Sequence, residues 1–181
     1  FWWEFILMAN NLDNFINEFN GGNRTHRYDV EMRFPGGGFD DSLNRFFIRA
    51  VSLPPSQVNP IRVPYRGRIL KWPGDRIYFP WTFRVLDQGG KESLWTKFND
   101  WSNTINDHKT NINNQDWDDF TTDWKIKQIG ANGNTVLKEV TLFDCWPTII
   151  GPISMDANSI DTLVEFTVTV EYSYHTVKDV N

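Results

Sequence analysis

A strict alternation of apolar and polar side chains between residues 164 and 172 constrains the fold more than any other feature of this sequence. Successive side chains of a β-strand point to opposite faces, so this pattern predicts a strand with one face in a core and the other exposed. Similar alternation or short apolar runs predict five further strands at 28–34, 46–51, 77–86, 124–129 and 136–143, and we expect about seven strands in all. The apolar members of the best pattern are Val164, Phe166, Val168, Val170 and Tyr172, and the polar members are Glu165, Thr167, Thr169 and Glu171.

Helical spacing of apolar residues occurs at two places. Apolar side chains between Leu94 and Ile105 lie on one helical face and predict a helix over residues 91–106. A shorter pattern between Leu12 and Phe19 predicts a short helix near the N-terminus. Many strands with one well-formed helix predict a mainly β protein, a β-sandwich or barrel with helical decoration.

The segment 54–74 differs from the rest of the chain. Its five prolines are incompatible with a regular central strand, because proline cannot donate to the hydrogen-bond ladder. Basic side chains alternate there with apolar ones, so the sequence predicts a long projecting loop with extended pieces. Long ordered loops in compact domains are usually functional. The candidate interface residues of this loop are Arg62, Tyr65, Arg66, Arg68 and Lys71.

Charge and cysteine content exclude several classes of protein. The 181 residues carry a formal charge of −5, which disfavours general binding to nucleic acid. Residues 1–90 have 11 Lys and Arg against nine Asp and Glu, and residues 91–181 have seven against 14. This asymmetry fits either self-association or two solvated faces. The single cysteine, Cys145, rules out an internal disulfide framework and is expected to be a structural residue.

No constellation of residues predicts catalysis. The acidic residues Asp116, Asp118 and Asp119 could be glycosidase acids or calcium ligands, but the run lacks the glycine and the distal glutamate of an EF-hand loop, so a solvated loop is the favoured interpretation. Three scattered histidines leave little for a metal centre, and no cofactor site is expected. The nine Trp and 14 Phe coincide mostly with buried phases of strands and helix, which favours a core over a sugar-binding platform.

The N-terminal segment is too short for a membrane anchor. Residues 1–7 are apolar except for Glu4, and no stretch of the chain approaches 18 apolar residues. We therefore expect a soluble, unexported chain, with residues 1–10 as an N-terminal extension of a single domain at 11–181. Met8 resembles an ordinary translation start.

Ordered short motifs cover nearly all of residues 11–175. Together they resemble the tail tube proteins of contractile-tailed (T-even-type, myovirus) bacteriophages. The motifs are Tyr28-Asp29-Val30-Glu31-Met32, Ser52-Leu53-Pro54-Pro55, Ile61-Arg62-Val63-Pro64-Tyr65-Arg66-Gly67-Arg68, Pro73-Gly74-Asp75-Arg76, Trp81-Thr82, Phe98-Asn99-Asp100-Trp101, Lys138-Glu139-Val140, Trp146-Pro147-Thr148, Gly151 and Phe166-Thr167-Val168-Thr169-Val170.

The resemblance implies a structural virion protein without enzymatic activity. Members of that family form hexameric rings, with a shared β-barrel lumen, that stack into a tube inside the contractile sheath. The implied partners are the tail sheath protein, the tape-measure protein, the baseplate tube-initiating proteins and genomic DNA, which passes through without specific binding. The implied location is the phage tail, after assembly in the host cytoplasm. The alternatives are a baseplate tube initiator, a tube terminator, a secretion-system tube protein and, from another class, a carbohydrate-binding module.

The residues suggest two assembly surfaces within this frame. The arginines of segment 54–74 can form bidentate pairs with carboxylates, and the acidic segment 116–123 of another copy offers Asp116, Asp118 and Asp119. The polar phase of the last alternating strand can line the lumen, or it can face outward. The candidate lumen-facing residues are Glu165, Thr167, Thr169 and Glu171.

Overall fold

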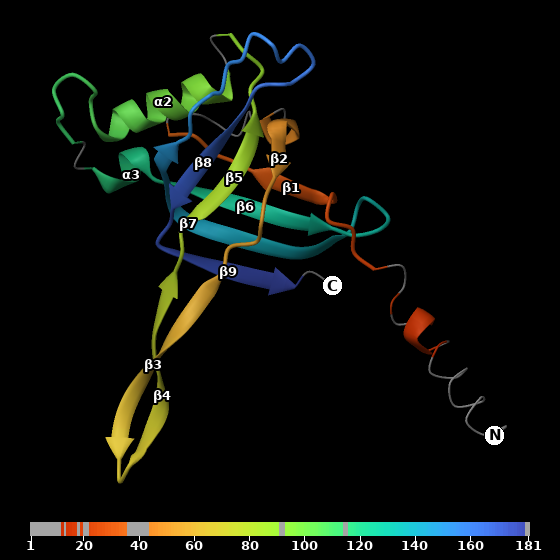
Figure 1. Ribbon diagram of the computed structural model, residues 1–181, viewed down its shortest axis with the longest axis vertical. Helices are drawn as coiled ribbons and strands as arrows, with labels where there is room; N and C mark the ends of the chain where they lie inside the picture. The colour runs from red at the N-terminus through yellow and green to blue at the C-terminus, as the bar shows by residue number, and fades with distance from the viewer. Residues whose placement is uncertain are drawn as a thin grey trace.

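The computed structural model describes residues 22–35, 44–90, 93–113 and 116–179, and part of a helical segment between Leu12 and Phe19 (Figure 1). The N-terminal extension expected at residues 1–10 lies outside the described residues. In chain order, the elements are β1 (Tyr28–Glu31), the 3₁₀ helix η1 (Asn44–Phe47), β2 (Ile48–Ala50), β3 (Ser56–Tyr65), β4 (Arg68–Tyr78), β5 (Trp81–Leu86), α2 (Leu94–Ile105), α3 (Trp117–Phe120), β6 (Thr122–Ile129), β7 (Val136–Ile150), β8 (Glu165–Glu171) and β9 (Tyr174–Asp179).

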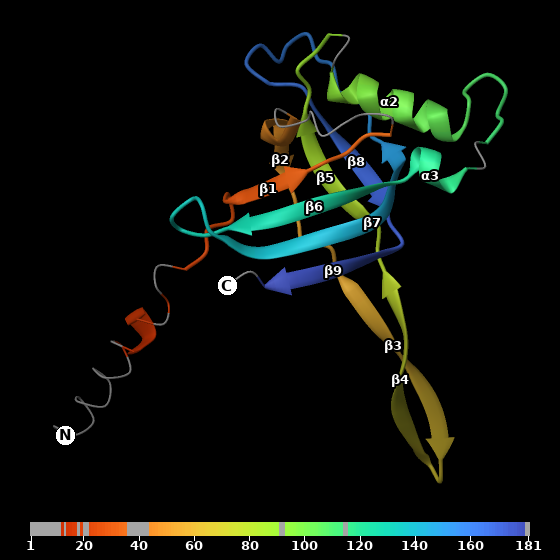
Figure 2. The ribbon, with the colours of Figure 1, turned by 180° about the vertical axis from the view of Figure 1, so that it is seen from behind.

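Seven of the strands form one antiparallel sheet that curls into a half-barrel. The strand order is β1-β6-β7-β8-β5-β2, and β9 pairs with β7 beside this path. The long strand β7 belongs to both halves of the sheet. Its first part pairs with β6 and β9, and Trp146–Ile150 pairs with β8. In Figures 1 and 2 the strands β1, β6, β7 and β9 run across the view, whereas β5 and β8 run steeply.

The sheet turns a corner inside β7. Asp144 has a φ of 56°, a left-handed conformation that Asp adopts more readily than most residues, and the buried Cys145 follows it. The strand expected at 136–143 is only the first part of β7, which continues through Trp146 and Pro147 to Ile150. Among the described residues Trp146–Ile150 pairs only with β8, and proline is tolerated in a strand with such an open side because no ladder bond is needed there.

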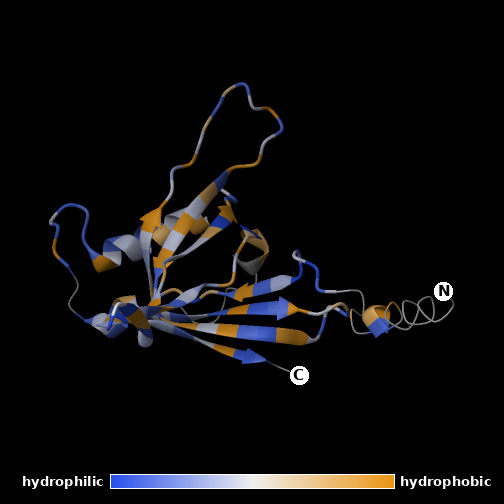
Figure 3. Cartoon of the chain, turned by 60° about the horizontal axis from the view of Figure 1, so that its bottom comes forward, coloured by the Kyte–Doolittle hydropathy of each residue, from blue (hydrophilic) through white to orange (hydrophobic). Residues whose placement is uncertain are grey.

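The core lies between the two halves of the sheet and α2. The helix begins after Ser93, whose hydroxyl accepts from the Thr96 backbone N–H at 3.2 Å, and it contributes Leu94, Phe98 and Trp101 to the core. Its bounds fall within the predicted range 91–106. The alternation of hydropathy along the strands is visible in Figure 3, and the apolar phases of β1, β2, β5, β6, β7 and β8 face this core.

Buried tryptophans tie connecting segments to the core through their indole N–H groups. Trp124 is fully buried, and its Nε1 donates to the carbonyl oxygen of Arg33 at 2.9 Å. Trp101 donates to the carbonyl oxygen of Phe120 at 2.7 Å, which fixes the end of α3 against α2. A buried indole that keeps a hydrogen bond contributes its large apolar area without an unsatisfied donor.

Three elements differ from the sequence-based expectations. Segment 54–74 is a two-stranded hairpin, β3–β4, and not a loop. Prolines fit a two-stranded ribbon because each strand has an open side, and a register shift between Val58 and Pro60 absorbs the irregularity. The acidic segment contains the short helix α3, and β9 was not expected at all. No helix in the described part of the chain is long and apolar enough to cross a membrane.

Candidate assembly surfaces

The hairpin β3–β4 projects from the body of the protein and is exposed along its length (Figures 1 and 2). A two-residue turn of Arg66 and Gly67 joins the strands, and both residues have positive φ, 44° and 79°. Such turns match the twist of a two-stranded ribbon. The guanidinium carbon of Arg66 lies 5.4 Å from the centre of the Tyr65 ring. The five interface residues predicted in segment 54–74 all lie exposed on this hairpin.

The register of the hairpin separates its side chains into an apolar face and a basic face. Ile61 pairs with Trp72 and Val63 pairs with Leu70, so these four side chains share one face. The pair Tyr65 and Arg68, next to the turn, continues this apolar face, and the opposite face carries the pair Arg62 and Lys71 and the pair Pro64 and Ile69. All four residues of the apolar face are exposed, with Trp72 63% accessible. A contiguous exposed apolar surface of this kind marks an interaction site.

An aromatic cluster fixes the root of the hairpin to the body. The ring of Tyr78 lies 5.0 Å from that of His175 and 6.0 Å from that of Tyr172, measured between centroids. Burial lowers the pKa of His175, and the charge of Arg76 lowers it further. Burial is also the main cause that raises the pKa of Tyr172 to about 12. The hairpin is thus anchored at one end and free along the rest of its length.

The acidic residues Asp116, Asp118 and Asp119 are exposed at α3, beside α2. The structure does not bring them to the basic face of the hairpin within one chain, because α3 and the hairpin tip lie far apart in both views (Figures 1 and 2). Asp118 also lines a surface hollow of about 420 Å³ with Asp123 and Asp144.

The polar phase of β8 is exposed and its apolar phase is buried, as the alternation predicts. Phe166, Val168 and Val170 are buried in the core. The candidate lumen-facing residues Glu165, Thr167, Thr169 and Glu171 share the opposite face, where they are exposed or half-buried. On this face the hydroxyl groups of Thr169 and Thr82 of β5 form a hydrogen bond of 2.9 Å.

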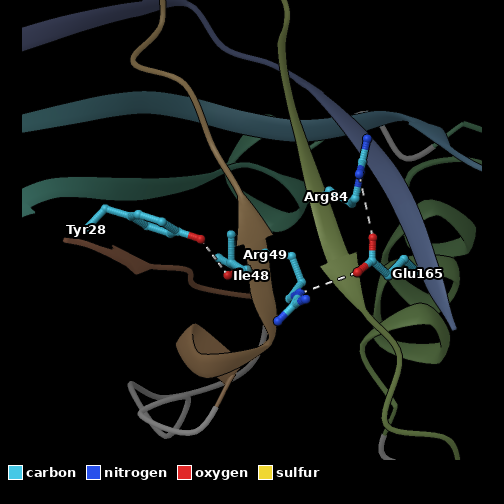
Figure 4. Close-up of polar contacts among 5 residues, drawn as sticks. All are labelled: Tyr28, Ile48, Arg49, Arg84 and Glu165. Carbon is cyan, nitrogen blue, oxygen red and sulfur yellow. Dashed lines mark hydrogen bonds and ion pairs between the residues drawn. The ribbon is translucent and has the colours of Figure 1, made fainter. Parts of the chain in front are cut away.

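Two arginines on this face were missed by sequence reasoning. Arg49 of β2 and Arg84 of β5 both reach the carboxylate of Glu165 on β8 (Figure 4). The neighbouring main chain is held by the hydroxyl of Tyr28, which donates to the carbonyl oxygen of Ile48 at 2.8 Å. The sequence does indicate the orientation of Arg84, because this residue stands between apolar residues of β5 and therefore on the polar phase of the strand. What the sequence does not contain is the strand order that places β5 between β2 and β8.

Cys145 lies fully buried at the corner of β7, and burial raises the pKa of its thiol far above the ordinary value. A thiol that stays protonated is a poor nucleophile, in keeping with a structural role. Within the part of the chain that the structure describes, no three His, Cys, Asp or Glu side chains are grouped to hold a metal ion.

Comparison with known proteins identifies the family of this chain. The chain matches the phage tail tube protein family over residues 23–178, and it belongs to that family. A tail tube protein of Serratia phage KSP90 is 31% identical over 170 residues, covering 87% of this chain and 93% of the relative. The tail tube protein gp19 of Enterobacteria phage T4 is 26% identical over 165 residues, covering 90% of this chain and 98% of the relative.

Solved structures share the fold at low sequence identity. A sheath/tube terminator of an extracellular contractile injection system (PVC) has a TM-score of 0.63 at 19% identity, covering 86% of this chain and 95% of that one. The tube-terminating cap of the anti-feeding prophage has a TM-score of 0.64, also at 19% identity, covering 87% and 91%. The mainly β fold with its half-barrel sheet is therefore that of contractile injection tubes.

Proposed function

We propose that this protein is the repeating subunit of the inner tail tube of a contractile phage tail. Six copies form a ring, rings stack inside the sheath, and the continuous bore conducts genomic DNA. The number six comes from the resemblance to the family. The subunit assembles in the host cytoplasm, with the sheath protein, the tape-measure protein and the baseplate tube-initiating proteins as its partners.

The observation that carries the proposal is a run of four strands, β2-β5-β8-β7, with open edges on both sides. Within the described residues, β2 pairs only with β5, and Trp146–Ile150 of β7 pairs only with β8. Unpaired edges are liabilities that proteins normally cover. Pairing the β2 edge of one copy with the β7 edge of the next covers both, and repeating that contact closes a circle.

The dimensions of such a circle suit duplex DNA. Six copies of four strands give 24 strands, and spacing of about 4.8 Å with a tilt of about 40° gives a backbone diameter of about 48 Å. Side chains reduce the bore to about 40 Å, and duplex DNA is about 20 Å wide. The polar faces of Glu165, Thr167, Thr169 and Glu171 then line the bore, while the apolar phase of β8 stays in each subunit's own core.

The hairpin is the proposed contact between rings. Its apolar and basic faces are both exposed, so another copy of the protein can bury the apolar face and neutralise the basic face. Acidic groups are available at α3 (Asp116, Asp118 and Asp119) and in the loop 151–164, which carries Asp156 and Asp161. That loop lies at the end of the molecule opposite the hairpin (Figures 1 and 2), so head-to-tail stacking brings the two together.

The test replaces Arg62, Arg66 and Arg68 with alanine together. The variant is expected to keep the thermal unfolding temperature of the wild-type chain, because all three side chains are exposed and distant from the core. It is expected to form no tubes in negative-stain images. Normal tubes from this variant would refute the assignment of the hairpin to the ring-to-ring contact.

Acceptor residues are identified by charge reversal. Changing Arg62, Arg66 and Arg68 to glutamate together is expected to abolish stacking. Adding Asp156→Lys and Asp161→Lys to that variant restores stacking if the loop 151–164 is the acceptor. Restoration by lysine at Asp118 and Asp119 instead assigns the acceptor to α3.

A tube terminator is the second candidate function, since solved terminators share this fold. A repeating subunit polymerises into tubes of many rings, whereas a terminator forms a single ring. Subunit counts in the intact particle separate the two.

A further inference from the structure

The carboxylate of Glu165 joins two arginines that come from different strands (Figure 4). Its Oε1 accepts from Nε of Arg49 at 3.4 Å, and its Oε2 lies 3.7 Å from Nη1 of Arg84. Arg49 belongs to β2, Arg84 to β5 and Glu165 to β8, so the carboxylate gathers charge across three neighbouring strands. Both arginine side chains remain more than half exposed, at 57% and 58%, while Glu165 is 30% exposed.

These residues dominate the charge of the polar face. The strands β2, β5 and β8 and the segment Trp146–Ile150 carry two basic residues, Arg49 and Arg84, and two acidic residues, Glu165 and Glu171. The face is therefore neutral. In the ion pairs between described residues Glu165 has two arginine partners, whereas Glu171 has none.

A free guanidinium group in a bore would hold DNA. Arginine binds phosphate oxygens through two parallel hydrogen bonds, and each phosphate neutralised adds affinity through counterion release. Six copies place 12 arginines around each ring. Without them, six copies of two glutamates would give a ring of 12 negative charges that repel one another. Paired arginines thus cancel the repulsion, provided that they do not engage the passing duplex.

We propose that Glu165 is a positioning residue that holds Arg49 and Arg84 against the wall and keeps their guanidinium groups from the phosphates of moving DNA. This inference rests on the proposed function, in which the polar face of β8 lines the bore. The proposed contacts involve DNA phosphates and not bases, so the same effect of Glu165 is expected for duplex DNA of any sequence.

The test uses tubes assembled from the full-length chain and a short duplex DNA that fits the bore. Glu165→Gln is compared with Glu171→Gln, because both remove one negative charge from the same face of the same strand. Only Glu165→Gln releases the two arginines. Its tubes are expected to retain about tenfold more DNA than wild-type tubes at low salt, with the excess lost at high salt. Glu171→Gln is expected to stay near wild type.

Two further variants test whether the arginines cause the retention of DNA. Glu165→Asp keeps the charge but shortens the reach to the arginines, and an intermediate gain in retention is expected. Arg49→Gln and Arg84→Gln, added to Glu165→Gln, are expected to return retention to the wild-type level. Negative-stain images confirm that each variant forms tubes before its DNA is measured.

Equal retention by Glu165→Gln and Glu171→Gln would overturn the proposal, since net charge alone would then account for the effect. Unchanged retention in tubes of both Glu165 variants would overturn it too. Electron cryomicroscopy of the wild-type tubes separates these failures from failure of the proposed function. Glu165 outside the bore contradicts the lumen assignment, whereas Glu165 inside the bore with equal retention refutes only the shielding of arginine.

Discussion

The half-barrel body buries its apolar side chains, whereas the hairpin β3–β4 leaves them exposed. The body buries its alternating apolar residues between the two halves of the sheet and α2, and its buried tryptophans keep hydrogen-bond partners. The hairpin pairs strand with strand but buries almost nothing, and its four-residue apolar face is exposed. The body thus has a core of its own, whereas the hairpin leaves its apolar face to the contact proposed with another copy.

Under the proposed function, this difference assigns stability to the body and assembly to the hairpin. Isolated two-stranded ribbons are marginal in water, and here the hairpin is anchored at Tyr78, with the proposed ring-to-ring contact as its further support. Substitutions in the body should therefore change the free energy of unfolding, and substitutions in the hairpin should change polymerisation.

The largest effect is expected from a matched pair of tryptophans. Trp124→Ala removes a fully buried side chain and should cost about 3–5 kcal/mol of unfolding free energy. Trp72→Ala in the hairpin should change that free energy by less than about 0.5 kcal/mol, yet prevent tube formation. Chemical denaturation and negative-stain imaging measure the two effects. A large loss of stability in Trp72→Ala would contradict the separation of roles.

A matched pair of glycines gives a smaller effect. A Cβ at Gly151, the buried residue after β7, would lie 2.8 Å from the carbonyl oxygen of Thr167 in β8, so Gly151→Ala should cost about 1–3 kcal/mol. A Cβ at Gly74 would lie 2.6 Å from the carbonyl oxygen of Asn59, within the hairpin. Gly74→Ala should alter the hairpin's twist and weaken polymerisation, while thermal unfolding of the body stays unchanged. Equal loss of stability in both variants would refute this division.

The smallest effect is expected at the hairpin root. Because burial and Arg76 lower the pKa of His175, the folded state holds this group neutral, and the unfolded state binds the proton more readily. Stability is therefore complete above the ordinary histidine pKa, near 6.5, and falls as pH drops below it. His175→Gln should flatten this slope in pH-dependent thermal unfolding. The exposed His26, changed to Gln, serves as the control and should leave the slope intact.

Much of the body could be predicted from the sequence, because its period-two patterns are regular. The alternation at 164–172 predicted the buried and exposed phases of β8, except that Val164 lies before the strand and is exposed, and the spacing from Leu94 to Ile105 located α2. The hairpin was mistaken for a loop because its prolines exclude a central strand but not an edge-only ribbon. Both of its strands are exposed along nearly their whole length, so the pattern lacks the one-sided burial that marks an ordinary strand.

The candidate site was also predictable only in part, because local patterns place single residues but not their partners on other strands. Glu165 could be placed on the polar phase from local alternation, but its contacts with Arg49 and Arg84 depend on strand order. Residues that lie 116 positions apart, as Arg49 and Glu165 do, meet only through long-range pairing. Likewise, β9 was missed because its short, mostly exposed sequence has no clear alternation, and its strand conformation depends on pairing with β7.

The most direct test of the central claim is the structure of the assembled particle by electron cryomicroscopy. We predict closed rings in which β2 of one copy pairs with Trp146–Ile150 of the next. We also predict that the face that carries Glu165, Thr167, Thr169 and Glu171 lines a bore of about 40 Å, the width expected for a barrel of 24 strands. A bore lined by β1, β6 and β9, or rings whose hairpins touch no neighbouring copy, would contradict it.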